Sequence, residues 1–246
     1  MEYVARQANS QSNPRPNKAH CHYTLSHLKT RPKAHFAKSA HRLENLVVHT
    51  VICPLDDYPD WHKGREHYGV WLFEVDALQV LQRLGKARQL LADVLHPPGA
   101  RQAHITVFVN GFASERLRYD DDFSAEQLCA QVRAVQALAL KPFTLTIGSA
   151  QSFTSAAYLA VDLPESLLRL RQALAQAVTE VRQSAYIPHI TAGLYAKQVP
   201  MLKITERLCT LEDTPLCLTI RAVCFATYHA QEKQGLLSVQ RRIEFA

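Results

Sequence analysis

Two short strings carry the residue types best suited to proton transfer. They are Ala103-His104-Ile105-Thr106-Val107 and Pro188-His189-Ile190-Thr191-Ala192, and each lies in a β-branched run that predicts a strand. Residues i and i+2 of a strand project to the same face, so each histidine shares a face with the threonine that follows it. If the two pairs come together, they supply two imidazoles and two hydroxyls. Such a set suits general acid–base chemistry on a phosphate ester.

The two residue types predict a division of labour. An imidazole with an ordinary pKa near 6.5 can accept or donate a proton near neutrality. In-line displacement at phosphorus places the nucleophile and the leaving group on opposite sides, so one histidine on each side serves without a metal. The hydroxyls of Thr106 and Thr191 can donate to the non-bridging phosphate oxygens. The sequence leaves open which histidine is the base and which is the acid.

The paired His-x-Thr pattern resembles the 2H phosphoesterase superfamily, in its bacterial branch similar to 2′-5′ RNA ligases and RNA cyclic phosphodiesterases. The resemblance runs from about Tyr58 to the C-terminus, and the motifs lie 85 residues apart, which suits one motif per lobe. It implies an α+β fold with two pseudo-symmetric lobes of antiparallel sheet, helices on the outer faces and a central cleft. The family's catalytic and phosphate-binding positions match His104, Thr106, His189 and Thr191.

Four further residues are candidates for substrate binding. Tyr195 and Phe153 offer aromatic rings on which a base can stack, with core packing as the alternative. Arg101 and Arg65 offer guanidinium groups for a phosphate, with a solvated surface charge as the alternative. Strict alternation also predicts that Phe108 and Asn110 share the face of His104, and that Gly193 and Tyr195 share the face of His189.

The basic charge of the chain is concentrated at one end. The 246 residues carry a formal charge of +6, and residues 1–45 hold eight Lys or Arg against two acidic residues. The rest is balanced, so a basic field over the whole chain is not indicated. Residues 1–45 are predicted to be a disordered basic extension, and 46–246 a single bilobal domain. The extension holds five histidines at irregular spacing, which leaves a metal site there as an alternative.

Periodicity predicts the elements around the motifs. Expected strands cover 46–52, 68–75, 103–110, 143–150, 157–161, 187–195, 217–228 and 236–245, and expected helices cover 77–95, 125–138, 164–183 and 200–208. Asp76 and Ser124 are the predicted helix caps. The order suggests an internal duplication with one motif in each half.

Several classes of protein are disfavoured. No apolar run reaches transmembrane length, and the first residues do not read as a secretory signal, so a cytoplasmic protein without membrane association is expected. The six cysteines include no C-x-x-C pair and form no dense disulfide framework. A metal site or cofactor is not expected, because the strand pairs lack the third ligand that catalytic zinc sites use.

The sequence thus predicts a metal-independent, monomeric phosphodiesterase. Its expected substrates are 2′,3′-cyclic phosphate or 2′-5′ bonds in RNA ends or small nucleotides, with reverse RNA ligation as a second activity. The alternative is a nucleotide- or RNA-binding module that lacks catalysis, which would hold nucleotide and form no product. A histidine metalloprotein is the third hypothesis, and it would lose function with a chelator.

Overall fold

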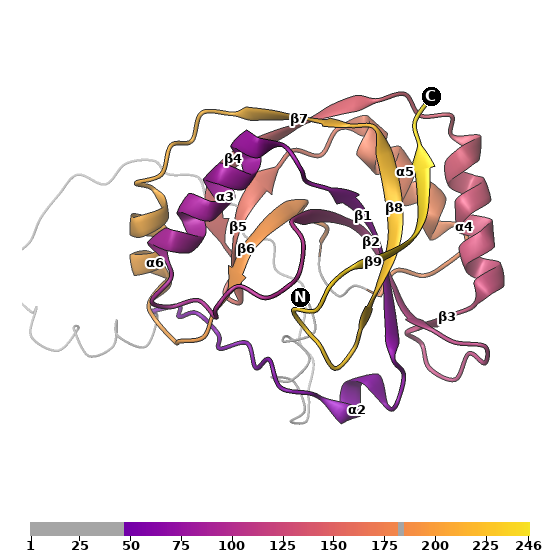
Figure 1. Ribbon diagram of the computed structural model, residues 1–246, viewed down its shortest axis with the longest axis horizontal. Coiled ribbons are helices and arrows are strands. Elements are labelled where there is room, and N and C mark those ends of the chain that lie inside the picture. The colour runs from indigo at the N-terminus through magenta and orange to yellow at the C-terminus, as the bar shows by residue number, and fades with distance from the viewer. Residues whose placement is uncertain (1–46, 182–184) are drawn as a thin grey trace, which may run out of the picture. The chain divides into compact units, whose positions relative to one another are not determined.

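The computed structural model describes residues 47–181 and 185–246, and the predicted extension 1–45 lies outside them. Within these two ranges, nine strands form one sheet in which all pairings are antiparallel except that of β3 with β2. The strands are β1 (His67–Glu74), β2 (His104–Ala113), β3 (Asp122–Phe123), β4 (Phe143–Ser152), β5 (Ala156–Val161), β6 (His189–Leu194), β7 (Leu216–Ile220), β8 (Ala222–His229) and β9 (Ser238–Glu244). The helices are α2 (Pro59–His62), α3 (Leu78–Leu90), α4 (Ala125–Ala137), α5 (Glu165–Ala175) and α6 (Met201–Leu208) (Figure 1).

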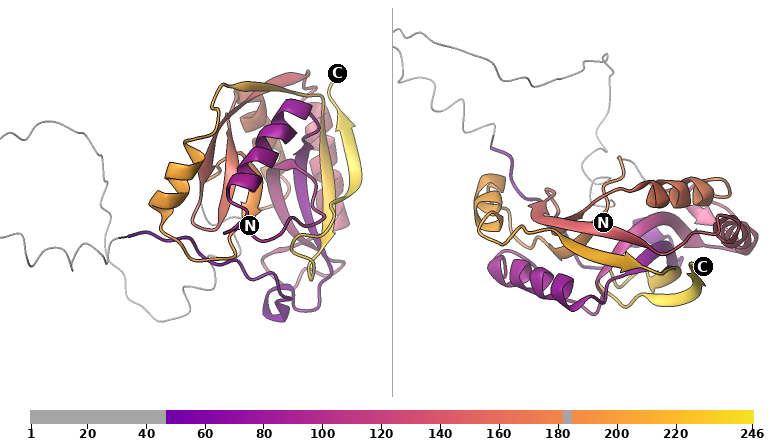
Figure 2. Two further views of the ribbon diagram at one scale, coloured as in Figure 1. Left: turned by 60° about the vertical axis from the view of Figure 1, so that its left-hand side comes forward. Right: turned by 90° about the horizontal axis from the view of Figure 1, so that it is seen from above.

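The strand order places the two motif strands at the centre of the sheet. The order is β7-β4-β5-β6-β2-β1-β8-β9, so β6 and β2 are neighbours and each begins a half of four strands. Helices α3 and α6 contact the half that contains β6, and α4 and α5 contact the half that contains β2 (Figure 2). This arrangement confirms the predicted α+β fold built from two similar antiparallel halves with helices packed on them.

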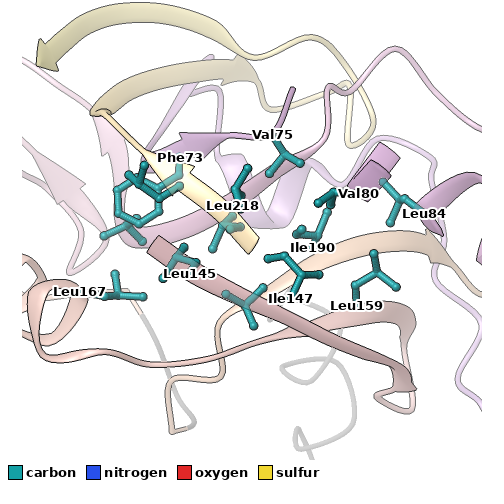
Figure 3. Packing of buried hydrophobic residues seen from close by; sticks show 14 of the residues in the cluster. Phe73, Val75, Val80, Leu84, Leu145, Ile147, Leu159, Leu167, Ile190 and Leu218 are labelled. Atoms are coloured by element: carbon teal, nitrogen blue, oxygen red, sulfur yellow. The ribbon is translucent and has the colours of Figure 1, made fainter. Parts of the chain in front are cut away.

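One continuous apolar core lies between the sheet and the helices. Figure 3 shows Val80 and Leu84 of α3 beside Ile190 of β6, with Leu159 of the neighbouring β5 and Ile147 of β4 close by. Ile190 is therefore the inward residue of the second motif, and Ile105, also fully buried, is that of the first. Burial of these isoleucines fixes the register, because a slip of one residue would exchange the core and solvent faces.

The motif strands pair only where the motifs begin. Ile105 pairs with Ile190, and beyond this point side chains take over the role of a neighbouring strand. Arg171 donates to the carbonyl of Val107, and the carboxylate of Glu180 accepts from the N–H of Val109 at 3.3 Å. Arg171 and Glu180 also form an ion pair at 2.6 Å. The backbone of β2 is thereby satisfied without a second partner strand.

Two bulges in β2 change the face that its later residues occupy. Val107 is an extra residue relative to β1, because Leu72 pairs with Thr106 while Trp71 pairs with Phe108. Asn110 is a second one, because Val70 pairs with Val109 while Gly69 pairs with Gly111. A bulge reverses the alternation of the residues that follow it. Phe108 and Asn110 are accordingly buried at 1% exposure, so the prediction that they share the face of His104 is wrong.

Several predicted boundaries differ from the observed ones. The predicted strand at 46–52 is not formed by its described residues, whose ladder pairing is a single bridge from His49 to Pro200. The predicted strand 217–228 is broken at Arg221 into β7 and β8, which lie in different halves of the sheet. The predicted helices 77–95 and 164–183 end at Leu90 and Ala175.

The two predicted helix caps have different outcomes. Ser124 caps α4 with a complete capping box, in which its hydroxyl accepts from the N–H of Gln127. Asp76 does not cap α3, because the N-cap is Ala77, which makes no side-chain hydrogen bond. Among the described residues, no helix is long and apolar enough to cross a bilayer.

Candidate active site

The strand register brings the four motif residues together on one face. Because Ile105 pairs with Ile190 in antiparallel strands, His104 stands opposite Thr191 and Thr106 stands opposite His189. Residues that face each other across a ladder have Cβ atoms about 4.5–5.5 Å apart. In both strands the histidine and threonine are partly exposed while the residue between them is fully buried. These four residues, called the tetrad below, therefore lie on the face of the sheet away from the core. An approximate two-fold axis relates the pair on β2 to the pair on β6.

Both imidazole rings are held by the same type of contact. Nδ1 of His104 lies 2.8 Å from the carbonyl oxygen of Gln102, and Nδ1 of His189 lies 2.7 Å from that of Ile187. A carbonyl only accepts, so Nδ1 carries the hydrogen in each ring. The second nitrogen, Nε2, is then the one that exchanges a proton with a substrate. Each motif thus fixes a ring and its tautomer through its own backbone, two residues upstream.

The environment of His104 favours its neutral form. Although the surface of His104 is partly exposed, desolvation by the protein atoms packed around its ring is the main cause that lowers its pKa from 6.5 to about 4, and the positive charges of Arg101 and His189 lower it further. The hydrogen bond to Gln102 acts in the opposite direction. Because the neutral ring is the one that accepts a proton, His104 is suited to be a general base over most of the pH range.

Phe153 lies against the second motif. Its ring is 5.0 Å from that of His189 in an edge-on arrangement, and it stacks at 4.1 Å on Tyr158. Tyr158, which pairs with Thr191 in the sheet, also meets His189 edge-on at 5.4 Å. Sequence reasoning missed Tyr158, because its place beside His189 depends on a register that only the folded sheet reveals. Phe153 is partly exposed, so one side of this aromatic pair is open to a ligand.

Arg101 is located near the first motif and has a nitrogen without a partner. Its guanidinium stacks on the ring of Tyr228 at 3.9 Å, and its Nε donates to the carbonyl of Gly235 at 3.1 Å. Nη2 is buried and makes no hydrogen bond of ordinary geometry among the described residues, although the Tyr228 hydroxyl beside the guanidinium acts to raise the pKa of Arg101. A buried guanidinium nitrogen left in this state is unfavourable unless an anion or a water meets it. Arg101 is therefore well suited to hold a phosphate beside His104.

Tyr195 does not reach the tetrad. It is fully buried in the core, and its hydroxyl lies 2.5 Å from that of Ser152. The cause is an extra residue, Ala192, in β6 relative to β5, which reverses the alternation after Thr191. The prediction that Tyr195 shares the face of His189 is wrong, and its placement gives no support to a base-stacking role.

Arg65 is held by acidic residues of the protein itself. Its Nη1 donates to Asp121 at 2.6 Å and to Asp122 at 2.5 Å, and all three side chains are at most 11% exposed. Burial raises the pKa of Asp122, but hydrogen bonds from Arg65 and from two backbone N–H groups lower it overall. The charge of Arg65 is thus neutralised, which makes contact with a substrate phosphate unfavourable. This placement gives no support to the prediction that Arg65 binds substrate.

A structural role for Arg65 has a measurable consequence. Replacing Arg65 with Met should lower the free energy of unfolding by about 3–5 kcal/mol, because two buried carboxylates lose their partner. Chemical denaturation measures this loss, and Arg116→Met, at an exposed arginine, is the matched control that should change little. If Arg65→Met instead unfolds like the wild type and loses phosphate binding, the predicted substrate role of Arg65 is restored.

Comparison with known proteins identifies the family of the chain. A sequence profile described as the 2′-5′ RNA ligase superfamily matches residues 82–232, which include both motifs. Among proteins whose function has been curated, no relative matches the sequence.

Solved structures show where the fold recurs. The crystal structure of Escherichia coli LigT complexed with 3′-AMP is 15% identical, with a TM-score of 0.53, and the match covers 74% of this chain and 99% of LigT. The crystal structure of TT0787 from Thermus thermophilus is 16% identical, with a TM-score of 0.50, over 72% of this chain and 97% of that one. At these identities the likeness establishes the fold alone. From the profile match over more than half its length, the chain belongs to the 2′-5′ RNA ligase superfamily, within the 2H phosphoesterases.

Proposed function

We propose that this protein is a metal-independent phosphodiesterase that acts on 2′,3′-cyclic phosphate or 2′-5′ phosphodiester bonds in RNA ends or small nucleotides. The observation that carries the proposal is the two-fold arrangement of the tetrad, in which both rings donate from Nδ1 to a backbone carbonyl. Membership of a phosphoesterase superfamily supports it. The structure of LigT with 3′-AMP supports a nucleotide as the ligand class.

In the proposed hydrolysis of a cyclic phosphate, His104 is the base. Its neutral Nε2 takes a proton from water, and the water oxygen forms a bond to phosphorus. The bond from phosphorus to O3′ breaks on the opposite side, and His189, which enters the step protonated on both nitrogens, donates its Nε2 proton to that departing oxygen. The product is a 2′-phosphomonoester. When the 5′-hydroxyl of a second RNA end takes the place of water, His104 takes its proton, the 5′ oxygen bonds to phosphorus and O3′ leaves with the proton from His189. This step forms a 2′-5′ bond and is the ligation that reverses 2′-5′ cleavage.

The remaining side chains hold the substrate in the proposal. The hydroxyls of Thr106 and Thr191 donate to the non-bridging oxygens, where negative charge increases in the transition state. Nη2 of Arg101 binds the same phosphate from the side of His104. A base stacks on Phe153, beside His189.

The proposed setting is the cytoplasm, with the protein acting as a monomer. The five cysteines among the described residues are all free, which suits a reducing compartment. Gel filtration with light scattering measures the oligomeric state, and a mass near 27.7 kDa is expected.

A substrate panel tests the proposed activity. The wild type is incubated with EDTA and with 2′,3′-cyclic mononucleotides, 2′-5′-linked dinucleotides and their 3′-5′ isomers, and the products are resolved by the position of the phosphate. We expect turnover of the cyclic or 2′-5′ substrates and none of the 3′-5′ isomers. Nucleotide binding without any product would favour the alternative, a binding module. Activity that EDTA abolishes would favour a metalloprotein.

The pH dependence of catalysis tests the assignment of His104 as the base. Its pKa is lowered, so the ring stays neutral and active until the pH falls to about 4. The acid limb of kcat/KM should therefore lie well below pH 6.5. Arg101→Gln removes one positive charge and should move this limb upward, by less than about one pH unit because burial is the main cause. An acid limb at pH 6.5 in both proteins would contradict the assignment.

A further inference from the structure

A second buried arginine nitrogen lacks a partner, on the other side of the sheet from the tetrad. Arg83 of α3 is 7% exposed, and its Nη1 is buried with no hydrogen-bond acceptor among the described residues. Burying an unpaired cation is strongly unfavourable, so a guanidinium in this position is normally met by a carboxylate or another anion. The protein itself, in the part that the structure describes, supplies no such group to Nη1.

Arg83 lines a cavity of about 290 Å³. One wall is a stripe on α3, formed by residues at helical spacing: Gln79, Gln82, Arg83 and Lys86. The other wall consists of Leu211 and Glu212, which follow α6 in the chain, and of Leu216, the first residue of β7. Hydrogen-bond donors thus face two apolar side chains and a single carboxylate across the cavity.

The charge of the cavity favours an anion. Arg83 and Lys86 carry two positive charges against the one negative charge of Glu212, which forms no ion pair with Arg83. A guanidinium binds phosphate or carboxylate oxygens in a bidentate manner, and the two glutamine amides add neutral donors. The leucines suit an organic portion attached to the anion. We propose that this cavity binds a small organic molecule that carries a phosphate or carboxylate group.

The proposed site is separate from the motif histidines. Val80 and Leu84 place α3 on the core side of β6, where they lie beside Ile190 (Figure 3). His189 and Thr191 project from the opposite face of the same strand, because side chains alternate. A ligand in the cavity therefore cannot touch the tetrad, and the two sites can be tested independently.

Phosphate titration of the isotope-labelled full chain, followed by NMR, tests the proposal. Inorganic phosphate should shift the amide signals of α3 and of residues 211–216, in the wild type and in His104→Asn/His189→Asn alike. Arg83→Gln should weaken this binding at least about tenfold, since it removes the bidentate donor. The matched control is Arg169→Gln, at an exposed arginine of α5, which should bind as the wild type does. An acetate titration distinguishes a carboxylate ligand from a phosphate ligand.

Two further variants keep the test decisive if Arg83→Gln folds poorly. Lys86→Gln changes an exposed residue and should weaken binding, while Glu212→Gln removes the opposing charge and should strengthen it. Unchanged binding in Arg83→Gln, or no shift in these segments with either anion, would overturn the proposal. A Glu212→Gln variant that is less stable than the wild type and whose anion binding is unchanged would also overturn the proposal, because Glu212 would then be the partner of Arg83.

Discussion

Replacing His104 or His189 with asparagine is expected to reduce kcat/KM for a cyclic phosphate by about 10²–10⁴-fold in each case. Asparagine carries an amide nitrogen near the position of Nδ1, so it can keep the hydrogen bond to the carbonyl of Gln102 or Ile187. It has no counterpart of Nε2 that can exchange a proton. The loss should therefore appear in kcat, measured by steady-state kinetics, with little change in the free energy of unfolding.

The control for these variants is His67→Asn, which changes an exposed histidine at the start of β1. It should leave kcat/KM unchanged. The double variant should lose less than the product of the two single losses, because the base and the acid act in the same step. Wild-type activity in either single variant would show that its imidazole is not the acid or the base.

Thr106→Val and Thr191→Val are expected to lower kcat by about 10²–10³-fold each. Valine has nearly the same shape and a high preference for strands, so the sheet should remain intact. The lost hydroxyl is a donor to oxygens whose charge grows in the transition state, so kcat should change more than KM. Thr144→Val, at an exposed threonine of β4, is the matched control. A rise in KM alone would mean that the hydroxyls bind substrate and transition state equally.

The sequence was sufficient to predict the tetrad because the relevant geometry is local. Alternation places His104 with Thr106, and His189 with Thr191, as long as no bulge separates the members of a pair. The first bulge of each motif strand comes later: Val107 follows the first pair and Ala192 follows the second. The predictions for Phe108 and Tyr195 failed for this reason, since a one-residue bulge has no distinct signature in these runs.

Long-range pairing is the second limit of the sequence. Arg65 looked like a free cation because its acidic partners lie 56 and 57 residues away in the chain. The break at Arg221 was also hidden, because β7 and β8 are both apolar and differ only in the half of the sheet that each joins. Arg101 and Phe153 needed no such partner to be proposed, and the structure places them near His104 and His189.

The most direct test of the two-histidine account is a single-turnover assay on a 2′,3′-cyclic nucleotide in the presence of EDTA. The wild type is compared with His104→Asn/His189→Asn at enzyme concentrations well above that of the substrate, so that weak binding does not mask chemistry. The account predicts a 2′-phosphomonoester from the wild type and no product above the uncatalysed reaction from the double variant. Equal product from both proteins would contradict it.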